Sequence, residues 1–310
     1  MTVALITHTA CLGHDTGPYH PECPDRLRVV LQALEHHDFA PLLREQAPEA
    51  TVEQLERAHT PAYVDAILEI RPQPGHARQI DADTLMSAGT HDAILRGAGG
   101  AVAGVDAVME GWARAAFVAA RPPGHHAEPQ RAMGFCFFNN AAVAAQHARA
   151  RWGLARVAVL DFDVHHGNGT QAIFARDAGL FYGSSHQHPC YPGTGMAREH
   201  GIAGNIVNAP LPPGADGPAF RHAWDTIIFP ALEDFAPELL VVSAGFDAHR
   251  DDPLAELQLD TPDFAWITQR LVDIADRHCN GRIVSVLEGG YDLRALAASA
   301  ETHVRALMRL

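Results

Sequence analysis

Two short segments of the chain combine carboxylates with a histidine in a pattern that suits one bound metal ion. The segment Asp161–Gly169 contains Asp163 and His165, and residues i and i+2 of an extended chain point to the same side. A second segment, Ser243–Asp247, ends in another carboxylate. Three protein ligands with a fourth position left open are typical of catalytic zinc, because structural zinc sites are closed by four ligands. The pattern therefore indicates a catalytic metal centre at Asp163, His165 and Asp247.

A pair of adjacent histidines suits acid–base work near this metal. His125 and His126 follow an apolar run, and as neighbours they point in different directions, which is unfavourable for joint ligation. Histidine titrates near neutral pH, so we expect His126 to take a proton from a water that the metal activates, with His125 as its positively charged partner. Each ring needs an acceptor on its other nitrogen, and Asp161 and Asn168 are the candidates. Taken alone, a His-His pair is more often a surface feature.

A tyrosine after a glycine pair completes the set. Gly289 and Gly290 allow a tight turn that can direct the phenol of Tyr291 back toward the metal. There it could donate a hydrogen bond to the oxyanion of a tetrahedral intermediate, although on local evidence alone a packing role is favoured. Together these segments supply a metal, a base and an oxyanion donor, the set that metal-assisted amide hydrolysis requires.

Each of these segments follows a short apolar run, which reads as a buried strand. Strands are expected at Val3–Thr7, Ala116–Ala119, Arg156–Phe162, Leu180–Ser184, Leu239–Ser243 and Arg282–Leu287. Helices are expected at Asp25–Glu35, Thr51–Arg57, Pro61–Ile70, His91–Glu110, Asn140–Trp152, Pro218–Phe235, Thr261–His278 and Leu293–Met308. This alternation predicts a doubly wound α/β fold with a parallel sheet, and ligands bind at the carboxyl edge of such sheets. No linker or internal repeat divides the chain, so we expect a single domain over residues 1–310.

Composition restricts the class of protein. The chain has 310 residues, with 23 basic residues, all arginine, against 37 acidic ones, and a net charge of −14. Such acidity argues against nucleic-acid binding, which needs a basic face. The five cysteines are scattered without a CxxC pair, which favours reduced thiols in the cytoplasm. No apolar stretch of 18 residues is free of charges, so we predict no membrane span.

Motifs along almost the whole chain resemble those of the histone deacetylase and acetylpolyamine amidohydrolase superfamily. They are His20-Pro-Glu22, Asp25-Arg-Leu27, Asp81–Thr84, Arg121–His126, Gly134–Asn139, Asp161–Gly169, Pro192–Gly195, Ser243–Asp247 and Leu287–Tyr291. The forms Gly-Phe-Cys-Phe-Phe-Asn and Leu-Glu-Gly-Gly-Tyr are similar to the class II branch and its bacterial relatives. The resemblance implies an arginase-deacetylase fold, with an eight-stranded, mostly parallel sheet and helices on both faces.

The resemblance also implies specific ligands and substrate contacts. One catalytic zinc, with Fe²⁺ as an alternative in the cell, would be bound by Asp163, His165 and Asp247, beside the catalytic residues His125, His126, Tyr291, Asp161 and Asn168. One potassium ion would be bound by Asp161, Asp163, His165, Ser184 and Ser185, and a second, peripheral one would lie near Phe174 and Asn205. Substrate contacts would come from Asp83, Gly134, Phe135, Tyr191, Leu254 and Gly289.

The sequence departs from the family pattern at two positions. The usual His-Pro-Glu-Arg reads His-Pro-Glu-Cys, so Cys23 stands where an arginine is expected and the contacts of that arginine are lost or replaced. Asn168 stands where class I enzymes have an aspartate. His126 should therefore be held by an amide, as in class II relatives.

Other enzyme classes fit the sequence less well. A dimanganese ureohydrolase shares the fold but needs more carboxylates, and Gly167 and His249 occupy two of the positions concerned. No G-x-S-x-G elbow supports a serine hydrolase. Cys136 lies in an apolar run, so it is better suited to the hydrophobic core than to the role of a catalytic nucleophile. A catalytically silent acyl-lysine sensor would have lost Tyr291, His126 or a metal ligand, and all are present.

The leaving amine is harder to predict. In one branch of acetylpolyamine deacetylases a glutamate reads the substrate's charge, and the matching position here is Leu254. This neutral residue favours acyl-lysine in peptides or proteins over acetylated polyamines or other small amides. The acyl length and the physiological substrate stay open, and a homo-oligomer is one alternative for the assembly.

Overall fold

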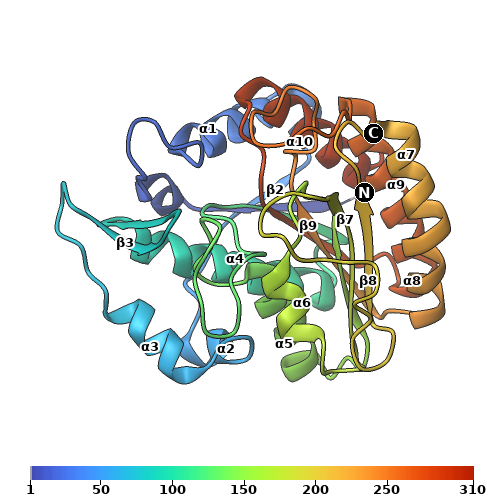
Figure 1. Ribbon diagram of the computed structural model, residues 1–310, viewed down its shortest axis with the longest axis horizontal. Helices are drawn as coiled ribbons and strands as arrows, with labels where there is room; N and C mark the ends of the chain where they lie inside the picture. Colours follow the sequence, from blue (N-terminus) through green and yellow to red (C-terminus); the bar gives the residue numbers. More distant parts are fainter. Residues whose placement is uncertain (1) are drawn as a thin grey trace.

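The computed structural model describes residues 2–310 and places eight parallel strands in one sheet (Figure 1). Their order is β2-β1-β5-β10-β9-β6-β7-β8, and each neighbouring pair is parallel. The bounds are β1 (Val3–Thr7), β2 (Leu43–Gln46), β5 (Ala115–Ala119), β6 (Val157–Asp161), β7 (Leu180–Gln187), β8 (Ile206–Leu211), β9 (Leu239–Ala244) and β10 (Ile283–Leu287). The predicted eight-stranded α/β fold is confirmed.

Helices cover both faces of the sheet. One face carries α4 (Thr90–Glu110), α5 (Asn140–Trp152) and α6 (Asn168–Phe174). The other carries α1 (Pro24–Ala33), α7 (Gly217–Ala223), α8 (Phe229–Phe235), α9 (Thr261–His278) and α10 (Leu293–Met308). Every residue of β5, β6, β7, β9 and β10 is therefore buried, which explains why these strands are apolar runs rather than alternating patterns.

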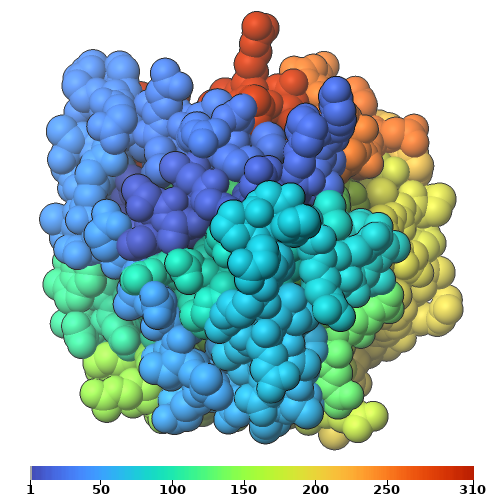
Figure 2. Space-filling view, turned by 90° about the vertical axis from the view of Figure 1, so that its left-hand side faces the viewer, coloured from blue at the N-terminus to red at the C-terminus, as the bar shows by residue number. Residues whose placement is uncertain are grey.

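A smaller group of elements lies beside the sheet. It consists of α2 (Val52–Glu56), α3 (Pro61–Glu69) and the antiparallel hairpin of β3 (Ala77–Asp81) and β4 (Thr84–Ser87). These segments, light blue to cyan, lie on the face seen in Figure 2. The loop between β3 and β4 contains Asp83, so this hairpin brings a predicted substrate contact toward the carboxyl edge of the sheet.

Five features differ from the expected elements. The strands β2 and β8 were not predicted. All residues of β2 are exposed, and β8 contains Asn208 and Pro210, so neither strand has the apolar run of a central strand. The helix expected at Pro218–Phe235 is divided into α7, a π-helical turn at Trp224–Ile228, and α8. The seven-residue helix α6 and the β3–β4 hairpin were not expected.

The described residues also bear on disulfides and membranes. The structure records Cys11, Cys23, Cys136, Cys190 and Cys279 as free thiols. Burial raises the pKa of Cys136 well above 9.0, so this thiol is protonated and unsuited to nucleophilic attack, as predicted. Within residues 2–310, no helix has both the length and the apolar character that a membrane crossing needs.

Candidate metal centre and active site

The predicted site residues meet at the carboxyl edge of four adjacent strands. In the sheet these strands lie in the order β5, β10, β9, β6. The segments that follow them contain His125 and His126 after β5, Tyr291 after β10, Asp247 after β9, and Asp163 and His165 after β6. Parallel strands end at the same edge, so positions far apart in the sequence converge there.

The three predicted ligands form a compact buried cluster. His165 Nδ1 lies 3.2 Å from Asp163 Oδ1 and 3.1 Å from Asp247 Oδ2, and the ligand atoms all lie within 4.8 Å of one another. Backbone amides fix the remaining carboxylate oxygens. Val164 N donates to Asp247 Oδ1 at 2.8 Å, and Gly289 N donates to Asp163 Oδ2 at 2.8 Å. Each carboxylate thus keeps one oxygen directed toward His165.

This donor set fits a divalent cation. Burial and the neighbouring Asp163 carboxylate raise the pKa of Asp247 to about 7, because two buried carboxylates face each other. A divalent ion between them would offset that repulsion, and two carboxylates with one imidazole are ligands that zinc accepts while keeping a position open. A Cβ at position 289 would lie 2.0 Å from Asp247 Oδ2, so only glycine leaves the ligand in place.

The two adjacent histidines are in opposite electrostatic environments. His125 Nδ1 donates to Asp161 Oδ2 at 3.0 Å, and His126 Nδ1 lies 2.8 Å from Asn168 Oδ1. Burial opposes protonation of His125, but Asp163 and Asp161 raise its pKa to about 10. Burial, and then the charge on His125, lower the pKa of His126 well below 6.5. The pair therefore consists of a charged His125 and a neutral His126 that is free to accept a proton.

A pocket opens onto the cluster. Its lining consists of Asp83, His126, Gly134, Phe135, His165, Tyr191, Leu254 and Tyr291. The pocket thus brings together a metal ligand, the neutral histidine, the tyrosine and every predicted substrate contact except Gly289. Gly289 lies outside this lining, and its N–H holds the ligand Asp163 instead.

Tyr291 is held by residues from two distant segments. Arg26 donates to the Gly290 carbonyl, and its Cζ lies 4.7 Å from the centre of the Tyr291 ring. Asp252 Oδ2 accepts the N–H of Tyr291 at 2.6 Å. Burial and the nearby Asp247 outweigh Arg26 and raise the pKa of Tyr291 well above 10.0, so the phenol stays protonated as a hydrogen-bond donor.

Arg26 belongs to a buried ion-pair network that does not include the cysteine at position 23. Glu22 accepts from Arg26 Nη1 at 3.1 Å and from Arg121 Nη2 at 2.6 Å. Cys23 has no such contact and stands at the N-cap of α1. The network was not predicted, although Glu22, Arg26 and Arg121 all lie in the quoted motifs. Their charges could have indicated it, since charged side chains that are buried are normally paired with opposite charges.

The entrance of the pocket is shaped by the loop after β3 and the turn at Gly134. Asp83 Oδ1 accepts the N–H of Gly134 at 3.0 Å. Gly134 has φ +57°, and a Cβ there would lie 2.4 Å from the ring of His126. Tyr191 is 39% exposed, and its ring meets His126 edge-on with the centres 5.1 Å apart. Asp83 therefore holds the turn that precedes Phe135, and both Phe135 and Tyr191 line the pocket.

The predicted potassium donors are also brought together. Asp161, Asp163, His165, Ser184 and Ser185 are all buried beside the metal cluster. Burial raises the pKa of Asp161 even though charged His125 lies beside it, so a further cation next to this carboxylate would stabilise its ionised form. At the expected peripheral site, the carbonyl oxygens of Phe174, Asp177 and Leu180 lie 3.0, 3.1 and 2.8 Å from Asn205 Nδ2. An amide nitrogen carries only two N–H donors, so it cannot satisfy all three carbonyls, and the second ion at this place stays a prediction.

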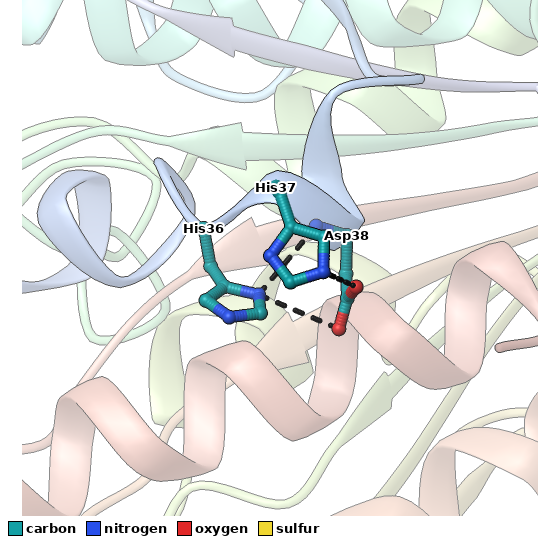
Figure 3. A group of neighbouring side chains, drawn as sticks. All are labelled: His36, His37 and Asp38. Carbon is teal, nitrogen blue, oxygen red and sulfur yellow. Dashed lines mark hydrogen bonds and ion pairs between the residues drawn. The ribbon is translucent and has the colours of Figure 1, made fainter.

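A second histidine–aspartate group lies on the surface. His36, His37 and Asp38 are consecutive (Figure 3), and His37 Nε2 lies 3.0 Å from Asp38 Oδ1. Arg305 Nη1 lies 2.7 Å from Asp38 Oδ2 and lowers the pKa of that carboxyl group. A guanidinium that already pairs with the carboxylate opposes binding of a cation, and the His37 side chain is 83% exposed. This group therefore lacks the burial and open carboxylates of the strand-edge cluster.

Known proteins resemble the chain over nearly its full length. Residues 20–307 match the family model of the histone deacetylase domain. The histone deacetylase-like amidohydrolase of Pseudomonas aeruginosa is 40% identical over 310 residues, covering 93% of this chain and 81% of that protein. Histone deacetylase 14, chloroplastic, of Arabidopsis thaliana is 38% identical over 323 residues, covering 98% and 76%.

A solved structure extends the likeness to three dimensions. The crystal structure of the HDA15 HD domain superposes with a TM-score of 0.92 at 35% identity, covering 99% of this chain and 88% of that one. The predicted family is thereby confirmed. With this fold, these strand-edge residues and this family model, the chain belongs to the histone deacetylase family, whose named relatives are deacetylases and amidohydrolases.

Proposed function

We propose that this protein is a zinc-dependent deacylase that removes acetyl or other acyl groups from lysine side chains of peptides or proteins. The observation that carries the proposal is the pocket lining, in which His165, His126 and Tyr291 face one cavity. A metal ligand, a neutral base and a protonated phenol around one space are the parts that amide hydrolysis needs. A sensor that only binds acyl-lysine would not need them.

Each residue has a distinct part in this mechanism. Bound zinc supplies a Lewis acid that polarises the acyl carbonyl and makes water a better nucleophile at neutral pH. His126 accepts the proton of the attacking water at Nε2, because its Nδ1 is engaged by Asn168. Tyr291 donates a hydrogen bond to the developing oxyanion. His126 then returns the proton to the departing amine, while charged His125 stays paired with Asp161.

The pocket wall supports lysine as the leaving amine. Phe135 and Tyr191 offer aromatic surface to an aliphatic chain, and Leu254 at 37% exposure adds an apolar contact. A polyamine carries further positive charges, which an acidic residue at position 254 would recognise. Leu254 provides no such charge, so an uncharged lysine stem is the better match.

A kinetic panel on the zinc-loaded protein tests the substrate. The panel compares kcat/KM for acetyl-lysine peptides, longer acyl-lysine peptides and acetylated polyamines. We expect the lysine peptides to be preferred, and Leu254→Glu to shift the preference toward polyamines because it restores the missing charge. A preference of the unmodified protein for polyamines by a hundredfold or more would replace lysine with polyamine in the proposal.

We also propose one potassium ion beside Asp161 and a cytoplasmic location. The buried carboxylate supports the ion, and the free cysteines fit a reducing compartment. The Arabidopsis relative is named as chloroplastic, so location differs among similar proteins. Potassium content of the purified protein and the distribution of a fluorescent fusion measure the two points separately.

A further inference from the structure

Glu128 lies two residues after the neutral histidine and contacts it through an amide. Asn168 Nδ2 donates to Glu128 Oε1 at 2.8 Å, while Asn168 Oδ1 lies 2.8 Å from His126 Nδ1. The amide is thus held at both ends. Its other possible acceptors are more distant, since the His126 carbonyl lies 3.4 Å and Met133 Sδ 3.3 Å from Asn168 Nδ2.

The position of Glu128 is fixed by its backbone. Glu128 N donates to the Arg131 carbonyl at 2.9 Å, and His59 Nδ1 donates to the Glu128 carbonyl at 3.0 Å. His59 carries its proton on Nδ1, because its Nε2 accepts the N–H of Asn139 at 2.9 Å. The carboxylate is therefore presented to Asn168 from a short, well-anchored turn.

An asparagine amide offers an acceptor at one end and a donor at the other, so its orientation decides what the histidine must do. An ionised carboxylate can only accept hydrogen bonds, so it selects the orientation with Nδ2 toward Glu128. Asn168 Oδ1 then faces His126, and that oxygen can only accept. His126 must therefore carry its proton on Nδ1, which leaves the lone pair of Nε2 free for the pocket.

We propose that Glu128 is a positioning residue that fixes the amide of Asn168 and, through it, the Nδ1–H tautomer of His126. The mechanistic value of this tautomer rests on the proposed function, in which His126 accepts a proton at Nε2. With the amide reversed, Nδ2 would donate to Nδ1, and the proton would move to Nε2, where it blocks the base. Glu128 does not touch the substrate and acts only through Asn168.

A first experiment reads the tautomer without any turnover. ¹⁵N NMR of histidine-labelled, zinc-loaded protein reports which ring nitrogen of His126 is protonated, with the signal assigned by its absence in His126→Ala. We expect Nδ1–H in the unmodified protein and a loss or mixture of that form in Glu128→Leu. An unchanged Nδ1–H signal in Glu128→Leu overturns the proposal. This readout remains valid even if the proposed acyl-lysine substrate is wrong.

A second experiment compares the effect of Glu128→Leu on kcat in two backgrounds, where the proposal predicts different results. In the natural background, Glu128→Leu should lower kcat by about tenfold or more with little change in KM or zinc content, because a fraction of the protein lacks the free base. In an Asn168→Asp background, the new carboxylate fixes the tautomer by itself and repels Glu128. There Glu128→Leu should leave kcat unchanged or raise it. An equal loss in both backgrounds would mean that Glu128 has only a structural role.

The chain offers a matched control. Glu199 accepts from Gln171 Nε2, and Gln171 Oε1 lies 2.9 Å from His166 Nε2, so a carboxylate, an amide and a histidine form the same sequence of contacts. His166 does not line the pocket. Glu199→Leu should therefore change kcat by less than about twofold, a scale set by an ordinary surface substitution. A tenfold loss in this variant would show that the Glu128 effect is not specific to His126, and would also contradict the proposal.

Discussion

Two adjacent histidines with the same side chain have different protonation states because their partners differ. His125 faces Asp161, and His126 faces the uncharged amide of Asn168. The charge on His125 then helps to keep His126 neutral. The chain has Asn168 where class I enzymes have an aspartate. In the proposed mechanism this difference matters, since it leaves His126 without a direct carboxylate partner.

Substitution of the ligands and of the base should separate metal binding from turnover. Asp247→Asn weakens one of three ligands, so we expect zinc content and activity to fall together. His126→Ala removes the proton acceptor but no ligand, so we expect zinc to stay near one equivalent while turnover is lost. Elemental analysis of both purified variants provides the measurement. A zinc-free His126→Ala protein would mean that this histidine is a ligand.

Tyr291→Phe removes one hydroxyl and keeps the ring. If the phenol stabilises the oxyanion, kcat should fall by roughly 10²–10³, the scale for one oxyanion donor, while zinc content is unchanged. Steady-state kinetics on an acetyl-lysine peptide test this. A loss of less than tenfold would exclude Tyr291 from the mechanism and leave it with the packing role that its sequence context alone favours.

At the scale of elements, the loop after β9 and the turn after β10 are joined by one buried carboxylate. Asp252 Oδ2 accepts the N–H of Tyr291, and its Oδ1 accepts the N–H of Leu254 at 3.0 Å. Both partners line the pocket. Asp252 therefore couples the wall that contacts the substrate to the turn that carries the phenol.

Loss of this carboxylate should loosen Tyr291. We expect Asp252→Ala to lower kcat on an acetyl-lysine peptide by roughly tenfold, because a charge-assisted hydrogen bond to the turn is removed. The same change in a Tyr291→Phe background should have a much smaller effect, since the phenol is already absent. Asp251→Ala, at the exposed neighbouring position, is the control. Equal losses in both backgrounds would show that Asp252 acts elsewhere.

The sequence predicted the central elements better than the edges, for a physical reason. Central strands such as Val157–Asp161 are buried on both faces and must be apolar, so their runs are visible. The edge strand Leu43–Gln46 is exposed and has polar residues after Leu43, and only its pairing with β1 makes it a strand. Residues in motifs were located correctly at the strand ends. Glu128 and Asp252 were not assigned roles, because their partners are backbone or amide groups that only the fold brings near.

At the scale of the whole molecule, buried neutral histidines make stability depend on pH. Burial lowers the pKa of His59 and His186 to about 4 and that of His303 to about 3. In the unfolded chain the imidazole is exposed to water and has a pKa of about 6.5. Between roughly pH 6.5 and 4 the unfolded state therefore binds more protons, and the free energy of unfolding falls as the pH falls.

The His303 contribution can be measured separately. Each such histidine contributes up to about 1.4 kcal/mol per pH unit in this window, so His303→Asn should flatten the loss of unfolding free energy between pH 6.5 and pH 4 by a comparable amount. Urea unfolding at several pH values provides the measurement, with the exposed His76→Asn as control. Parallel pH dependence in all three proteins would refute a buried neutral His303.

The proposed cleavage of acyl-lysine requires one zinc at Asp163, His165 and Asp247. The most direct measurement is acetate release from an acetyl-lysine peptide by metal-free protein titrated with zinc. We expect this requirement to appear as no turnover without metal and as a linear rise in turnover that ends at one equivalent of zinc, with no rise in Asp247→Asn. Full turnover by the metal-free protein, or a rise that continues to two equivalents, would contradict it.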